Sequence, residues 1–140
     1  MALGAFGLTT NGTASDLTIT TAGTTICTAV TGLTGMQAMS LWLQLAYGSG
    51  GTSVACYLQQ GFDASTYMDT ACILFGTASE TAVLNFSGLT PKLSQITPSD
   101  GAMTSDTNLD GVMGDRCRLK VVVTGTYAGS TLLKGRIVCR

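Results

Sequence analysis

The sequence predicts an all-β domain: a two-sheet antiparallel sandwich of about eight strands, jelly-roll-like in arrangement. Its 140 residues include 23 Thr and 18 Gly but just two Pro, a composition typical of β-branched strands joined by tight turns. Apolar residues recur with period two in several segments, and no capped segment shows a helical period. A chain of this length buries about two-thirds of its unfolded surface, so we expect one domain that folds without a cofactor.

The chain divides into a Gly/Thr-rich extended arm, expected over residues 1–15, and a single β-sandwich domain over residues 16–140. Met39–Tyr47 alternates apolar and polar residues, and the alternation resumes at 53–60 after four turn residues, which predicts a hairpin. Residues near 91–115 hold Pro and Asp-containing turns and predict a long loop. Further strands are expected at 16–21, 24–30, 67–75 and 81–87.

A second hairpin is predicted for the last 25 residues, Arg116 to Arg140, which alternate around Ala128-Gly129-Ser130. The apolar residues of both strands take odd positions, and a three-residue loop would place Val121 opposite Ile137 so that the two apolar faces coincide. The same register places Leu119 opposite Cys139 and Arg118 opposite Arg140.

These 25 residues hold six of the seven basic residues and none of the eight acidic ones. Like charges directly opposed on a sheet are unfavourable unless an acidic group lies against them. We therefore expect this basic ribbon to dock on an acidic surface of a partner, with the chain's own Asp loops as the alternative. The expected contact residues are Arg116, Arg118, Lys120, Lys134, Arg136 and Arg140.

Two apolar features also predict contacts with a partner. The arm has apolar anchors but no periodicity, so we expect Leu3, Phe6 or Leu8 to pack on a neighbouring chain. Trp42 lies on the polar face of its strand, where its ring could anchor an interface or stack on a sugar. Burial of Trp42 under a loop or the second sheet is the alternative.

The sequence predicts neither catalysis nor a cofactor. It has no His, no paired acids and no nucleophile elbow, so we expect no enzyme. The five Cys lack zinc spacing and predict a core role, with Cys27 as the candidate for an intermolecular disulfide. Residues 106–111 match half of a calcium loop, but its final ligand position is Cys117, so turn chemistry is favoured and no metal is expected.

Charge and hydropathy argue against two kinds of partner. A net charge of −1 argues against bulk attraction to nucleic acid, which usually needs a basic excess over the whole domain, and leaves a local basic patch as the alternative. The chain lacks an apolar run of ~18 residues and a basic, apolar leader at its start, so we expect no membrane partner and synthesis in a host cytoplasm.

Two segments carry a resemblance: T-S-V-A-C-Y-L-Q-Q-G-F-D-A-S-T-Y-M-D-T-A at 52–71 and D-G-V-M-G-D-R-C-R-L-K-V-V-V-T-G-T-Y-A-G-S-T at 110–131. They resemble the small β-sandwich decoration, or cement, proteins that bind the outside of tailed-phage capsids. Where related sequences often carry Ser before the Asp and Trp after it, this chain has Phe62 and Tyr67.

The resemblance implies a structural virion protein on the capsid surface that stabilises the shell. Its implied partners are the major capsid protein and further copies of itself, arranged as a homo-oligomer on the capsid lattice. A tail or neck component and a carbohydrate-binding β-sandwich are the alternatives.

Overall fold

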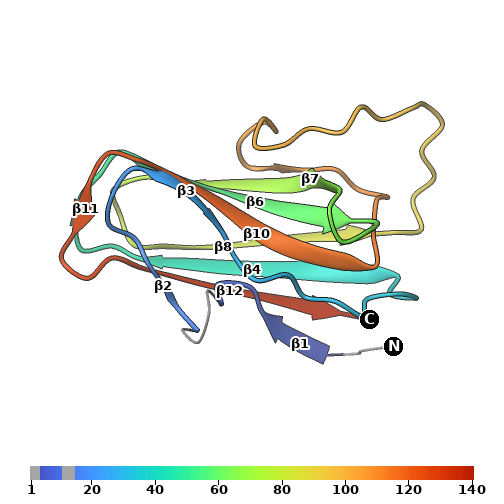
Figure 1. The fold of residues 1–140 in the computed structure, drawn as a ribbon, viewed down its shortest axis with the longest axis horizontal. Coiled ribbons are helices and arrows are strands. Elements are labelled where there is room, and N and C mark those ends of the chain that lie inside the picture. The colour runs from blue at the N-terminus through green and yellow to red at the C-terminus, as the bar shows by residue number, and fades with distance from the viewer. Residues whose placement is uncertain (1–3, 11–14) are drawn as a thin grey trace.

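The computed structural model describes residues 4–10 and 15–140, and this part of the chain is an all-β sandwich of two antiparallel sheets (Figure 1). Its strands are β1 Gly4–Gly7, β2 Leu17–Thr18, β3 Gly23–Ile26, β4 Ala38–Ala46, β5 Ser49–Gly50, β6 Ser53–Gly61, β7 Tyr67–Phe75, β8 Glu80–Ser87, β9 Thr107–Asn108, β10 Arg116–Thr124, β11 Tyr127–Ala128 and β12 Leu132–Cys139. One sheet, the β4 sheet, has the order β1-β12-β4-β8, with β2 also paired to β12. The other, the β6 sheet, has the order β3-β10-β6-β7-β9.

Alternate side chains of each long strand fill the space between the two sheets, because successive residues of a strand point to opposite faces. The inward faces predicted from the alternation are confirmed. Buried side chains include Leu41, Leu43 and Leu45 of β4, Val54, Cys56 and Leu58 of β6, Cys117, Leu119 and Val121 of β10, and Leu133, Ile137 and Cys139 of β12.

Both predicted hairpins are wrong, because the chain crosses between the sheets at each of them. β4 pairs with β12 and β8, whereas β6 pairs with β10 and β7. Likewise β10 and β12 lie in different sheets, so Val121 does not pair with Ile137, nor Arg118 with Arg140. Alternation shows which side chains of a strand face the core, but it does not distinguish two strands side by side from two that face each other across that core.

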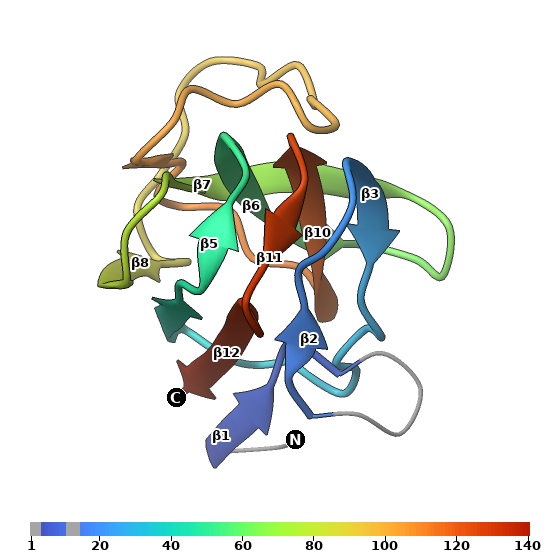
Figure 2. The ribbon, with the colours of Figure 1, turned by 90° about the vertical axis from the view of Figure 1, so that its left-hand side faces the viewer.

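The two crossovers lie together at one end of the sandwich, where β5 pairs with β11 (Figure 2). A Cβ on Gly48 would overlap the Gly129 carbonyl, and one on Gly51 would overlap the Tyr127 ring. The glycines that the sequence analysis assigned to hairpin turns therefore let two crossing segments approach closely.

The order of connections is that of a jelly roll, which confirms the predicted fold class. β6 and β7 pair within one sheet, whereas the connections β4 to β6, β7 to β8, β8 to β10 and β10 to β12 change sheet. The long loop expected near 91–115 is present apart from the two-residue strand β9.

The described part of the predicted arm belongs to the sandwich. β1 pairs with β12 from Gly4 to Gly7, and the Leu8 amide donates to the Gly135 carbonyl (2.8 Å). Phe6 packs half-buried against the core and Leu8 is fully buried in it. Both face this chain's own core rather than a neighbouring chain, which corrects that expectation and the expected boundary at residue 15. Leu3 lies outside the described residues.

The connection from β8 to β10 covers one outer face of the sandwich and so limits where a candidate site can lie. It runs along the outer side of the β6 sheet, above β7 in Figure 1. The Ser99 carbonyl accepts a hydrogen bond from the Asp69 amide (2.9 Å), which fastens the loop to β7. No comparable segment of the described chain lies along β4 and β8 on the other side of the sandwich.

Candidate functional site

The six predicted contact cations are divided between the two outer faces of the sandwich. Arg116, Arg118 and Lys120 occupy outward positions of β10, opposite Gly61, Gln59 and Tyr57 of β6. Lys134 and Arg136 occupy outward positions of β12, and Arg140 follows at its end. The single basic ribbon expected from the sequence is therefore wrong.

On the outer face of the β6 sheet, which we call the covered face, two cations form ion pairs within the chain. The Lys120 ammonium lies 2.7 Å from Asp100 Oδ1, and Arg116 Nε lies 2.8 Å from Asp115 Oδ1. Hydrogen bonds from Lys120 and then Gln59 lower the pKa of Asp100, and the bond from Arg116 lowers the pKa of Asp115. Their charges are met by the chain's own acids.

Arg118 on the same face is held by a ring and an amide. Its guanidinium lies 3.8 Å from the centre of the Tyr67 ring, and its Nε donates to Gln59 Oε1 (2.9 Å). The Gln59 Nε2 in turn donates to Asp69 Oδ1 (2.9 Å) and Asp100 Oδ1 (2.7 Å). For Arg116 and Lys120 the alternative, pairing with the chain's own Asp side chains, is therefore correct, whereas Arg118 is held within the chain by a ring and an amide.

The outer face of the β4 sheet, which we call the Trp42 face, differs in both charge and cover. Arg136 pairs directly with Trp42, and Trp42 with Val83, so a cation, an aromatic ring and an aliphatic side chain form one row across three strands. Val83 is 63% exposed and Val138 is 41% exposed. The outward residues of this face include Ala5, Ser40, Trp42, Gln44, Thr81, Val83, Asn85, Lys134, Arg136, Val138 and Arg140.

Trp42 is half-buried by its neighbours on the sheet, and the alternative of burial under a loop or the second sheet is wrong. Lys134 lies 3.9 Å from Asp16, with both side chains partly exposed, so this pair contributes little to stability. Arg136 and Arg140 form no ion pair with the described residues. The Trp42 face thus offers two guanidinium groups beside exposed apolar surface.

A groove of about 350 Å³ lies at one end of this face, between the chain entering β2 and the outer side of β12. Trp42, Lys134 and Arg136 line it together with Asp16 and Thr9. The Thr9 hydroxyl is already used, since it donates to the Ser15 carbonyl (2.7 Å). Three of the predicted contact residues therefore meet in one depression with a polar wall.

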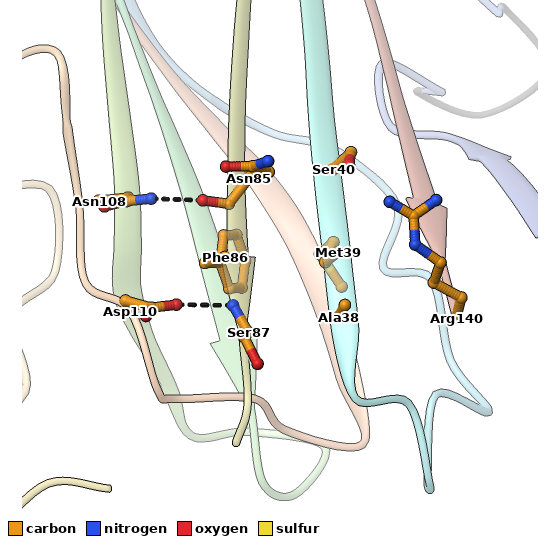
Figure 3. A pocket seen from close by; sticks show the side chains of 9 residues that line it. All are labelled: Ala38, Met39, Ser40, Asn85, Phe86, Ser87, Asn108, Asp110 and Arg140. Atoms are coloured by element: carbon orange, nitrogen blue, oxygen red, sulfur yellow. Dashed lines mark hydrogen bonds between the residues drawn. The ribbon is translucent and has the colours of Figure 1, made fainter. Parts of the chain in front are cut away.

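A second depression of about 420 Å³ lies at the other end of the face, beside Arg140 (Figure 3). Its far wall is the loop segment that precedes β10. Asn108 Nδ2 donates to the Asn85 carbonyl (2.7 Å), and Asp110 Oδ1 accepts from the Ser87 amide (2.6 Å). Sequence reasoning missed Ser40, Asn85, Asn108 and Asp110 as lining residues, although it noted the Asp/Asn/Gly motif for its turn chemistry.

That motif tethers the loop to two strands. Besides Asn108 and Asp110, which bond to β8, Asp106 accepts a hydrogen bond from the Leu74 amide of β7 (3.0 Å). The Thr90 hydroxyl and the Ser87 amide lower the pKa of Asp110 by donating to its carboxylate. Among the described residues, no group of three or more His, Cys, Asp or Glu side chains is placed to hold a metal ion.

The five Cys are free thiols, and all are buried. Cys27 is 2% exposed, and burial raises its pKa to about 11, so the expected intermolecular disulfide at Cys27 has no accessible thiol in this structure.

The described residues also contain no helix that is long and apolar enough to cross a bilayer. No known protein family matches the chain, and no curated protein sequence matches it.

Proposed function

We propose that this protein is a non-enzymatic structural component of a phage virion, which binds the outer surface of the capsid through its Trp42 face and stabilises the shell. The observation that carries this proposal is the contrast in charge between the two outer faces. Arg136 and Arg140 lie beside Trp42, Val83 and Val138 without an ion pair among the described residues. The jelly-roll sandwich also fits the fold that the resemblance to capsid decoration proteins implies.

The composition of the Trp42 face suits an interface with an acidic protein surface. Trp and Arg are the residues most enriched among energetic anchors, and here they are directly paired on a rigid sheet. A sheet presents them without the entropy cost of ordering a loop on binding. The major capsid protein is the proposed partner because its surface repeats many times around a shell.

A modest affinity per copy is sufficient for this role. On a closed symmetric shell, neighbouring copies bind at high local concentration, so weak contacts combine into a stable layer.

The test is co-sedimentation of the full chain with capsid shells of the phage that carries it, after the shells have been stripped of this protein. Arg136→Gln should reduce the affinity about tenfold, which is the range of an interface anchor, and should flatten its decrease with salt. Trp42→Ala should reduce it further. The number of copies bound per shell distinguishes a decoration protein from a tail or neck component, because a decoration protein binds in a multiple set by capsid symmetry.

The matched control is Arg118→Gln, since Arg118 is an outward cation on the covered face with partners in its own chain. This variant should bind shells with unchanged affinity and lose some thermal stability. The reverse pattern, in which Arg118→Gln weakens attachment and Arg136→Gln does not, would place the interface on the other face. Failure of the unmodified chain to bind shells would exclude the capsid role.

A second candidate is a carbohydrate-binding module, favoured by the groove that Trp42, Lys134, Arg136 and Asp16 line. An aromatic side chain flanked by charged groups is suited to stacking on a sugar and bonding its hydroxyls or carboxylate. Titration with neutral and acidic oligosaccharides tests it. Saturable binding that is lost in Trp42→Ala, together with no binding to shells, would favour this function.

A further inference from the structure

One edge of the β4 sheet is open along part of its length. The Gly88 amide donates to the Gln37 carbonyl (2.8 Å), just beyond the pairing of Ala38 with Ser87. This bond shows which residues of β8 bond to β4, because bonded and unbonded residues alternate along an antiparallel strand. The even-numbered residues of β8 bond to β4, and the odd-numbered residues direct their amide and carbonyl groups away from it. In Figure 2, β8 forms the left-hand margin of the molecule.

The chain itself covers the second half of this edge and leaves the first half open. The Asn85 carbonyl accepts from Asn108 Nδ2, and the Ser87 amide donates to Asp110 (Figure 3). The Ser87 carbonyl accepts from the Gly111 amide (2.9 Å). The outward backbone groups of Thr81 and Val83 form no hydrogen bond with any described residue. An unpaired edge of this kind pairs readily with another strand.

We propose that this edge, residues 80–84, pairs antiparallel with the same edge of a second copy of the chain, about a twofold axis at Ala82. Thr81 of each copy then lies opposite Val83 of the other and exchanges both backbone hydrogen bonds with it. The pairing uses the amide and carbonyl groups of both Thr81 and Val83. It also stops where Asn108 and Asp110 already cover the edge.

The free segment is self-complementary, which is why a second copy is the proposed occupant. Thr and Val form a favourable β-branched cross-strand pair, and the small Ala82 lies at the axis, where the two backbones approach most closely. Glu80 lies opposite Leu84 of the other copy. The two Glu80 residues are about 14 Å apart, since four residues separate them along the strands, so like charges do not oppose each other.

Such pairing would join the two β4 sheets into one continuous sheet. An axis perpendicular to the sheet keeps both Trp42 faces on the same side, with Thr81 of one copy beside Val83 of the other. The dimer would therefore present two Trp42 faces to one surface and increase its avidity. The inference depends on the edge geometry alone and holds or fails independently of the proposed capsid role.

The decisive experiment is disulfide trapping with the full chain. In a nonhydrogen-bonded antiparallel pair the Cα atoms are about 4.5 Å apart, which a disulfide can span. Ala82→Cys should therefore yield a reducible dimer under mild oxidation. Glu80→Cys is the matched control and should form no disulfide-linked dimer, and neither should the unmodified chain, whose native thiols are buried. Absence of the Ala82→Cys dimer, or equal trapping of Glu80→Cys, would overturn the proposal.

Sedimentation velocity over a range of concentrations provides a second readout without oxidation. The unmodified chain should dimerise with increasing concentration, and Val83→Pro should not. The Val83 amide faces away from β4, so proline removes a dimer bond and leaves the β4 ladder intact. Val83→Thr retains the amide and should dimerise normally. A monomeric unmodified chain, or a Val83→Pro variant that dimerises equally, contradicts the proposal.

Discussion

Lys120 and Lys134 occupy equivalent outward positions on the two faces of the sandwich, and each has an Asp nearby. The Lys120 side chain is 16% exposed and lies 2.7 Å from Asp100, whereas the Lys134 side chain is 48% exposed and lies 3.9 Å from Asp16. Both Lys residues lie in strands whose apolar and polar residues alternate in the same way. The difference is the long loop, which supplies Asp100 to Lys120 on the covered face and no acidic side chain to Lys134 on the Trp42 face.

The loop also determines which polar groups are buried. Asp69 and Gln59 are outward residues of β7 and β6, yet both are fully or almost fully buried beneath residues 99–102. An outward cation on the covered face therefore interacts with other side chains of the folded chain. An outward cation on the Trp42 face remains available to a partner, and the following predictions test this division.

The largest effect is expected for Asp69→Ala on the covered face. The Asp69 carboxylate accepts hydrogen bonds from Gln59 Nε2, the Ser99 hydroxyl and the Ala102 amide. Its removal leaves these donors without an acceptor and should lower the free energy of unfolding by about 3 kcal/mol. Thermal denaturation should show a decrease of about 10 °C in Tm.

Asp16→Ala is the matched control for this variant. Asp16 forms the long, partly exposed pair with Lys134 on the other face, so its removal should change the free energy of unfolding by less than about 0.5 kcal/mol. Equal destabilisation by the two substitutions would contradict the distinction between the faces.

A smaller effect is expected in the reactivity of Cys72, a buried residue at an outward position of β7. Cys72 pairs with Tyr57 of β6 and Thr107 of β9, so opening of the loop alone should expose it. Cys56 lies in the core and needs a wider opening. Thiol labelling followed by mass spectrometry should modify Cys72 about tenfold faster than Cys56.

Burial raises the pKa of both thiols, so labelling of the native protein should be slow at pH 8. Asp69→Ala, which loosens the loop, should accelerate labelling of Cys72 selectively. Equal rates for Cys72 and Cys56 in the unmodified chain would show that the loop and the core open together.

The smallest effect is expected in the dependence of stability on pH. Lys120 and Gln59 lower the pKa of Asp100 in the folded chain, and Arg118 contributes in the same direction. The stabilisation is therefore fully present above the unfolded pKa of about 4 and is lost as pH falls through the lower folded pKa. Asp100→Asn should flatten the decrease of Tm between about pH 5 and pH 3. An unchanged profile would mean that this carboxylate does not secure the loop.

Much of the fold was predictable from local pattern. The strand at residues 67–75 has the predicted bounds, and the inward residues of β4, β6, β10 and β12 follow the alternation. Composition and the lack of helical periodicity predicted the all-β class. These properties were accessible because alternation acts within each strand and needs no knowledge of its neighbours.

The candidate site was predicted in part. Lys134, Arg136 and Arg140 share one face, as expected, but the three basic residues of β10 do not join them, and the pairing of Arg136 with Trp42 was not predicted. Ser40 and Asn85 gave no signal in the sequence, and Asn108 was noted only for turn chemistry, because their place in the wall beside Arg140 depends on a contact between β8 and a loop more than 20 residues away.

The sequence by itself determined which side of each long strand is apolar and where the charge accumulates. Only the tertiary structure decided which strands are neighbours, since Gly48–Gly51 is as compatible with a hairpin as with a crossover against Gly129. It also decided which cations are neutralised, because Asp100 reaches Lys120 only after the loop folds over β6 and β7. Strand pairing and ion pairing depend on contacts between residues distant in the chain, and periodicity within one strand carries no information about them.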